Sequence, residues 1–122
     1  MNFLREGSPE LGTILLAHGA GAPMDSAAMT AAAQALAGHG FEVARFEFAY
    51  MAARREGARK PPPKAEKLMD EYRAAVTALG KAEPPLIVGG KSMGGRVASM
   101  VADELHASGK VAGMVFDGDF NT

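Results

Sequence analysis

Residues 83–102 of this 122-residue chain read EPPLIVGGKSMGGRVASMVA. The apolar run at residues 86–88 is long enough for one buried strand, and the residues after Gly95 follow a helical pattern. Between them, residues 90–94 fit G-x-S-x-G. A serine on a strained turn between a strand and a helix is typical of a nucleophile elbow, in which the hydroxyl projects above the sheet. The stretch therefore makes Ser92 the leading candidate for a nucleophile.

Two other interpretations of this glycine-rich stretch compete with the elbow. Gly90-Lys91-Ser92 also matches the end of the phosphate-binding loop G-x-x-x-x-G-K-[ST], but that loop requires a glycine where this chain has Pro85. The second alternative is a glycine-rich turn without chemistry, since five-residue motifs recur by chance. The strand before the motif and the helix after it favour the elbow over this second alternative.

Composition and length place limits on the class of protein. The chain is 48% hydrophobic and 22% charged with a net charge of −1, which predicts one globular domain and no general attraction to nucleic acid or anionic membranes. It has no cysteine, which excludes disulfides, cysteine nucleophiles and thiolate metal sites. No signal peptide or membrane-spanning stretch is visible. We expect a cytoplasmic protein without a cofactor, a metal, a nucleic-acid partner or a membrane partner.

The order of apolar runs predicts an α/β fold. Expected strands are residues 13–17, 41–48, 86–88 and 111–116, and expected helices are residues 27–37, 64–79 and the segment from the elbow to Ser108. Alternation of strands with helices predicts a three-layer α/β/α domain over residues 1–122 with a parallel sheet. The expected order across the four-stranded parallel sheet is 41–48, 13–17, 86–88, 111–116.

Residues 49–62 interrupt this rhythm and are expected to form a loop. They include the basic cluster Arg54, Arg55, Arg59 and Lys60, ahead of three prolines. Such a cluster is more often a solvated loop than a site, but it could also recognise a negatively charged substrate or partner.

Three segments resemble one known group of proteins. Residues 16–26, residues 48–55 with 60–62 after them, and residues 89–96 resemble motifs of small α/β-hydrolases related to dienelactone hydrolase. More narrowly, they are similar to the group of bacterial hydrolase-like proteins and eukaryotic testis-expressed and NSL-complex-subunit proteins. The resemblance covers residues 12–116 and implies a partial α/β-hydrolase fold.

The resemblance also implies roles for individual residues. Ser92 would be the nucleophile, and the backbone N–H groups of Met93 and Ala20 would stabilise the oxyanion that acyl transfer creates. The substrate loop would comprise His18, Gly19, Gly21, Arg54 and Arg55, with His18 ordering that loop by hydrogen bonding. Asp117 or Asp119, after the last strand, is the position where some hydrolases carry their acid.

The triad base is the point of departure from this group. His106 lies fourteen residues along the helix after Ser92, roughly 20 Å away at ~1.5 Å per residue. His39 follows a helix at the opposite edge of the sheet. We therefore expect a C-terminally truncated serine hydrolase of carboxyl ester or related acyl substrates, weak or inactive as this chain. The alternative is a non-catalytic protein-interaction module with the same fold.

The predicted last strand raises a further expectation about assembly. Residues 111–116 are apolar throughout, as in an interior strand, and no further strand follows them in the sequence. An open apolar edge promotes pairing with another chain. We expect self-association through this strand.

Overall fold

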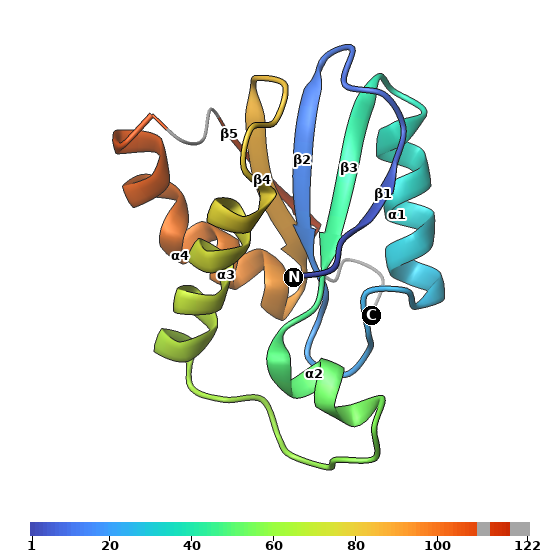
Figure 1. Cartoon of the computed structure of the whole chain (residues 1–122), viewed down its shortest axis with the longest axis vertical. Helices are drawn as coiled ribbons and strands as arrows, with labels where there is room; N and C mark the ends of the chain where they lie inside the picture. Colours follow the sequence, from blue (N-terminus) through green and yellow to red (C-terminus); the bar gives the residue numbers. More distant parts are fainter. Residues whose placement is uncertain (110–112, 118–122) are drawn as a thin grey trace.

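The computed structural model describes residues 1–109 and, for residues 113–117, the course of the backbone. The strands in this part of the chain are β1 (Leu4–Glu6), β2 (Gly12–Ala17), β3 (Phe41–Phe46), β4 (Leu86–Lys91) and β5 (Gly113–Asp117). They form one sheet in the order β1-β3-β2-β4-β5, shown in Figure 1. The pairs β3–β2, β2–β4 and β4–β5 are parallel, whereas β1 pairs with β3 antiparallel.

The prediction of a purely parallel, four-stranded sheet is wrong. The described sheet is mixed, and its order begins with a strand that the sequence analysis did not identify. β1 is three residues long, too short for a recognisable alternation of apolar and polar residues. Tertiary contacts hold it, because the Glu6 carboxylate accepts a hydrogen bond at 2.8 Å from the largely buried guanidinium of Arg45 on β3. Residues 111 and 112 of the predicted last strand lie outside the described residues.

Helices cover both faces of the sheet. They are α1 (Ala27–Ala37), α2 (Ala49–Arg54), α3 (Ala65–Leu79) and α4 (Met93–Ala107). Ile14 and Leu16 of β2 pack against α1, and Leu15 and Ala17 pack in the cluster that α3 and α4 cover. This alternation makes β2 a central strand with two buried faces. None of the helices in the described ranges has both the length and the apolar character needed to cross a bilayer.

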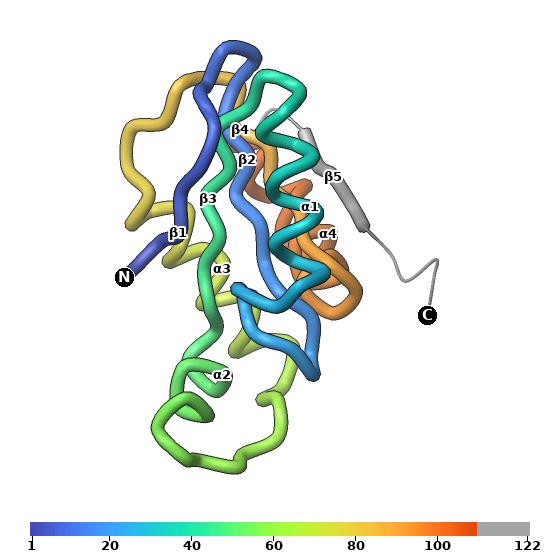
Figure 2. The backbone as a smooth tube through the Cα atoms, turned by 90° about the vertical axis from the view of Figure 1, so that its right-hand side faces the viewer, coloured from blue at the N-terminus to red at the C-terminus, as the bar shows by residue number. Residues whose placement is uncertain are grey.

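A short helix replaces part of the predicted loop at residues 49–62. α2 has only six residues, and its first N–H, that of Ala49, donates to the Glu71 carboxylate of α3 at 2.7 Å. A helix this short is not stable alone, so its formation depends on this tertiary contact. Figure 2 shows α2 and the loop after it beyond the ends of β2 and β3, at the opposite end of the molecule from the turn before β2.

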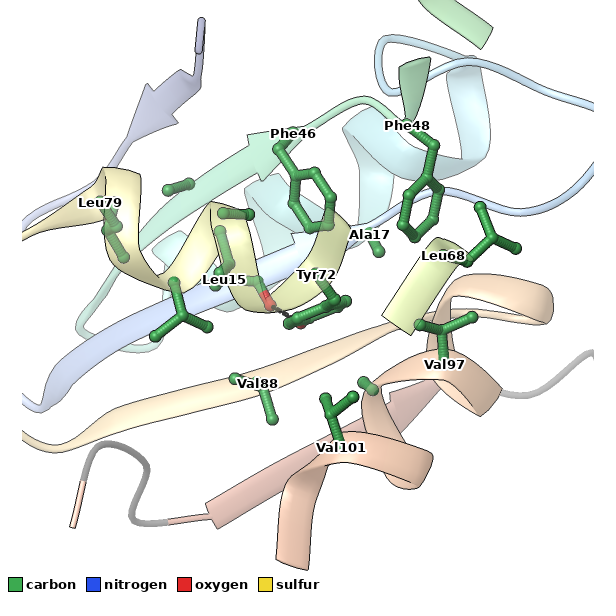
Figure 3. Close-up of a cluster of buried hydrophobic side chains, with 14 of the residues drawn as sticks. Leu15, Ala17, Phe46, Phe48, Leu68, Tyr72, Leu79, Val88, Val97 and Val101 are labelled. Carbon is green, nitrogen blue, oxygen red and sulfur yellow. Dashed lines mark hydrogen bonds between the residues drawn. The ribbon is translucent and has the colours of Figure 1, made fainter. Parts of the chain in front are cut away.

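Tyr72 of α3 links the core to the segment before the elbow (Figure 3). Its hydroxyl lies 2.8 Å from the Leu15 carbonyl oxygen, as Figure 3 shows. It also lies 2.8 Å from the Gly89 carbonyl oxygen, so the two carbonyls share its one proton, and it accepts the N–H of Gly89 at 2.9 Å. Burial raises the pKa of Tyr72, so the phenol stays protonated and keeps its donor. The contact fixes β2 and β4 to one another three residues before Ser92.

Candidate active site

Ser92 alone forms the turn between a strand and a helix. β4 ends at Lys91 and α4 begins at Met93. Ser92 has φ 54° and ψ −116°, and it is the one non-glycine residue with positive φ in the described part of the chain. Such a conformation costs ~1–3 kcal/mol and persists only where the surrounding structure enforces it. The turn lies where the sequence placed it, with the strained geometry typical of a nucleophile elbow.

The two glycines of G-x-S-x-G are required by close packing. A methyl group on Gly94 would collide with the His18 carbonyl oxygen and lie 2.6 Å from that of Ala17. A methyl group on Gly90 would lie 2.5 Å from the carbonyl carbon of Gly94. Real Cβ contacts are not this short, so the first turn of α4 can approach β2 and β4 only if both positions lack a side chain. This close approach holds Ser92 in its turn.

The loop after β2 lies directly beside Ser92. A methyl group on Gly19 would be 3.6 Å from the Ser92 Cβ, which is ordinary contact distance. The two segments line a pocket of about 190 Å³, together with the beginning of α1. Its lining residues are Gly19, Ala20, Gly21, Ala22, Ser26, Ala28, Met29, Lys91 and Ser92. We refer to it as the serine pocket.

His18 is buried behind this loop with both ring nitrogens engaged. The N–H of Phe48 donates to Nε2 at 3.1 Å, so Nε2 is the acceptor and the proton resides on Nδ1. Nδ1 donates to the carbonyl oxygen of Gly19 at 2.6 Å. Burial lowers the pKa of His18, and the ring is therefore neutral at pH 7. Both nitrogens of His18 are used to order the loop, so neither is free to act on Ser92.

The His18 contact also orients a backbone donor. In a planar trans peptide, C=O and N–H point in opposite directions. Because the Gly19 oxygen is held against His18, the N–H of Ala20 points away from the imidazole. Within the described residues no backbone or side-chain acceptor takes that N–H. The N–H of Met93, the first residue of α4, is likewise one of the helix donors without an intrahelical partner.

Tyr50 of α2 holds the next peptide of the same loop. Its hydroxyl donates to the carbonyl oxygen of Ala20 at 2.8 Å and lies 3.9 Å from the Met93 sulfur. Burial raises the pKa of Tyr50, which keeps the hydroxyl protonated as a donor. Arg54 stacks on the same ring, with its guanidinium carbon 5.1 Å from the ring centroid. Tyr50 therefore connects the basic segment after α2 to the loop beside Ser92.

Arg55 has a different environment from the one the sequence analysis proposed. Its guanidinium forms two hydrogen bonds of 2.7 Å with the Glu47 carboxylate and two, of 2.6 and 3.3 Å, with the Asp25 carboxylate. Burial works to raise the pKa of Glu47, but the hydrogen bonds from Arg55 and from the Met24 N–H lower it overall. Arg55 thus joins the end of β3 to the segment before α1. It does not line the serine pocket.

Of the two acid candidates the structure describes one, Asp117, and the two histidines that were excluded as the base, His39 and His106, lie away from Ser92. Asp117 ends β5, where its Cα is paired with that of Lys91 in the parallel register. Asp119 lies outside the described residues. His39 follows α1 at the opposite edge of the sheet, where its Nδ1 is 2.7 Å from the Ala35 carbonyl oxygen. His106 is exposed in the last turn of α4. In the part of the chain that the structure describes, no cluster of three or more His, Cys, Asp or Glu side chains could hold a metal ion.

Sequence reasoning did not identify three residues at this site. Tyr50 reaches it only because α2 folds back over the sheet end, and no local pattern marks that contact. Ser26 lines the serine pocket while its Oγ accepts the Met29 N–H as the N-cap of α1. Lys91 lines the same pocket, and its place beside Ser92 in the motif was the available signal.

Comparison with known families agrees with this geometry. Residues 10–118 match the profile of the alpha/beta hydrolase domain. The chain belongs to the alpha/beta hydrolase family. No characterised protein sequence matches it significantly.

Two solved structures are similar to this alpha/beta hydrolase domain. The monoacylglycerol lipase of Paleococcus ferrophilus is 26% identical, with a TM-score of 0.60 over 95% of this chain and 42% of the lipase. Brefeldin A esterase, a bacterial homologue of human hormone-sensitive lipase, is 22% identical and supports the fold, with a TM-score of 0.56 over 89% of this chain and 31% of the esterase. The chain therefore spans less than half the length of each.

Proposed function

We propose that this chain is a serine hydrolase of carboxyl esters or related acyl substrates, with Ser92 as nucleophile. The observation that carries the proposal is the strained φ of Ser92 at a one-residue strand-to-helix turn, beside a loop whose peptides are held by His18 and Tyr50. The motifs at residues 16–26, 48–55 and 89–96 further support a relationship to the dienelactone-hydrolase-like group. The serine pocket, about 190 Å³ in volume, provides space for an acyl group beside Ser92.

The proposed reaction follows from the donors around the pocket. The Ser92 Oγ attacks the acyl carbon, and the carbonyl oxygen takes up the negative charge. The N–H groups of Met93 and Ala20 stabilise this oxyanion, which forms as the carbonyl double bond opens. The leaving group then departs with the electron pair of its bond to the acyl carbon, leaving an ester on Ser92. Water attacks this ester in the second step and releases the acid.

The Ser92 proton has no histidine acceptor among the described residues. His18 uses both nitrogens elsewhere, His39 lies at the other edge of the sheet, and His106 is at the far end of α4. We propose that solvent hydroxide or water takes the proton. An oxyanion hole without a base leaves only a small part of the usual rate enhancement. We propose slow acylation by this chain, and turnover of p-nitrophenyl acetate near background.

Labelling with a fluorophosphonate probe tests the nucleophile. Phosphonylation forms an oxygen–phosphorus bond at Ser92 and releases fluoride, and intact-mass and peptide analysis locate the adduct. We expect one adduct, on Ser92, which is absent in Ser92→Ala. Ser99→Ala is the matched control, because Ser99 is exposed on the same helix with its Oγ donating to the Arg96 carbonyl. A folded protein that remains unlabelled at saturating probe would refute the proposal.

The lack of a histidine at Ser92 in the described residues favours a second candidate, a non-catalytic interaction module with this fold. It predicts that Ser92 is unreactive and that Ser92→Ala leaves partner binding unchanged. Fast ester turnover that disappears in Ser92→Ala would exclude this second function. That result would also show that another group acts as the base.

A further inference from the structure

A second pocket lies in the loop between α2 and α3. It has a volume of about 520 Å³ and is lined by Arg54, Gly57, Ala58, Arg59, Lys60 and Pro61. We refer to it as the basic pocket. The loop lies beyond the carboxyl ends of β2 and β3, at the same end of the sheet as the beginning of α4, as Figure 1 shows.

The charges of the basic pocket are not compensated by the protein. Arg54, Arg59 and Lys60 supply three positive charges, and no acidic residue among those that the structure describes lines the pocket. None of the three forms an ion pair with a carboxylate of the described residues, whereas Arg5, Arg45, Arg55 and Arg73 all do. Three like charges in one concavity repel one another, and an anion placed among them relieves that repulsion.

Arg55 accounts for this imbalance. It engages two carboxylates, Asp25 and Glu47, and neither of them lines the basic pocket. Glu56 belongs to the same loop, but it does not line the pocket and forms no ion pair within the described residues. The basic cluster thus divides into one structural arginine and three cations that face a cavity.

The backbone of the basic pocket is held by its own hydrogen bonds. The Arg54 guanidinium donates to the Lys60 carbonyl oxygen at 3.2 Å, which closes the loop. The N–H groups of Gly57 and Ala58 donate to the carbonyls of Arg54 and Ala53 at 3.1 Å. Gly57 has φ +98°, a conformation that favours glycine. An ordered loop loses less conformational entropy when a ligand binds, so the pocket is partly preorganised.

One aromatic ring connects the basic pocket to the nucleophile. Arg54 stacks on Tyr50, and the hydroxyl of the same ring donates to the Ala20 carbonyl and lies against the Met93 side chain. Ala20 and Ser92 both line the serine pocket. A substrate that extends past Tyr50 can therefore occupy the serine pocket with its scissile carbonyl and reach Arg59 and Lys60 with its other end.

We propose that the basic pocket binds an anionic group of the substrate, so that the preferred substrates are acyl esters bearing a carboxylate or phosphate distant from the scissile carbonyl. This inference rests on the proposed role of Ser92. It assigns Arg59 and Lys60 to substrate selection, and it assigns Arg54 to both the pocket and the support of Tyr50.

Two p-nitrophenyl esters test this selection. The mono-p-nitrophenyl ester of suberic acid and p-nitrophenyl octanoate have acyl chains of equal length and differ in the terminal carboxylate. We expect the suberate ester to acylate Ser92 roughly tenfold faster at low salt, and this preference to shrink as salt screens the charges. Arg59→Gln/Lys60→Gln should remove the preference for the suberate ester. Arg5→Gln and Lys81→Gln, which remove positive charges elsewhere, should retain it.

A binding measurement keeps the two proposals separate. If no ester acylates Ser92, the proposed function fails, and calorimetric titration with suberate and with inorganic phosphate still tests the basic pocket. Binding that is lost in Arg59→Gln/Lys60→Gln but kept in Lys81→Gln supports the pocket, and the anion that binds identifies the group. Absence of binding by both anions refutes it. Equal acylation by the two esters, or a preference that persists in the double variant, also overturns the inference.

Discussion

Gly94→Ala tests the packing that produces the turn at Ser92. Gly94 is the second residue of α4, and a methyl group there would lie 2.6 Å from the Ala17 carbonyl oxygen and 2.7 Å from the Ala17 carbonyl carbon. Both atoms belong to the backbone of central strand β2, which cannot move without disturbing the pairs with β3 and β4. The first turn of α4 must therefore move outward instead.

The expected change in the free energy of unfolding of Gly94→Ala is the sum of two opposing contributions. Overpacking a well-packed site costs ~1–3 kcal/mol, and rigid backbone on the opposing side places this site near the upper limit. Replacing a helical glycine with alanine contributes about 1 kcal/mol of stabilisation. We expect a net loss of about 2 kcal/mol in the free energy of unfolding, with a fall in Tm of about 8 °C for a domain of this size.

Urea and thermal unfolding followed by circular dichroism measure this effect. Gly38→Ala is the matched control, because Gly38 has φ −68° and its nearest contact would be an ordinary 3.4 Å. It should be as stable as the parent chain or slightly more stable. Fluorophosphonate labelling of folded Gly94→Ala should also be slower, since Ser92 moves with α4. A Gly94→Ala protein as stable as Gly38→Ala would refute the argument that this glycine is needed for close approach.

Two further predictions concern the loop beside Ser92. Tyr50→Phe removes the donor to the Ala20 carbonyl. We expect roughly tenfold slower labelling of Ser92, with a loss of only about 1 kcal/mol in the free energy of unfolding. An unchanged labelling rate would contradict the role of Tyr50 in positioning this loop. For His18, a pKa lowered below 6.5 means that the unfolded state binds more protons. Stability should therefore be fully present above about pH 6.5 and fall as the pH drops below it, by at most about 1.4 kcal/mol per pH unit. His18→Gln should flatten urea-unfolding free energies between about pH 7 and about pH 5, and an unchanged slope would show that His18 is not the group responsible.

Much of the fold and the turn at Ser92 was predictable because their signals are local. The apolar run of β2 is buried on both faces, and its composition alone indicates a central strand. The helix at residues 27–37 has the predicted bounds, because Ser26 caps its beginning and Gly38 and Gly40 follow its end. Ser92 lies in its turn because the glycines at positions 90 and 94 permit an approach that no other residue would allow.

The predictions of the sheet and of the loop at residues 49–62 were wrong where the structure depends on contacts between residues distant in the sequence. β1 is held by Arg45, which lies 39 residues from its partner Glu6. The first N–H of α2 donates to Glu71, which belongs to a different helix, α3. Short elements such as these have little intrinsic stability, and their own sequence carries almost no periodicity. Arg55 and Arg59 belong to one basic cluster in the sequence. Only the positions of Asp25 and Glu47 in the folded structure show that Arg55 is neutralised.

The sequence by itself determined the alternation of strands and helices, the place of Ser92 between them, and the family. These depend on hydrophobic period and on glycines whose effect is confined to a few residues. Tertiary structure alone decided which groups meet at Ser92. His18 and Tyr50 are 32 residues apart in the chain. Both hold the loop after β2, because His18 directly follows β2 and α2 lies at the same end of the sheet. Hydrogen bonds and charges act over a few ångströms of space, and the chain brings such groups together only after the sheet and its helices have packed.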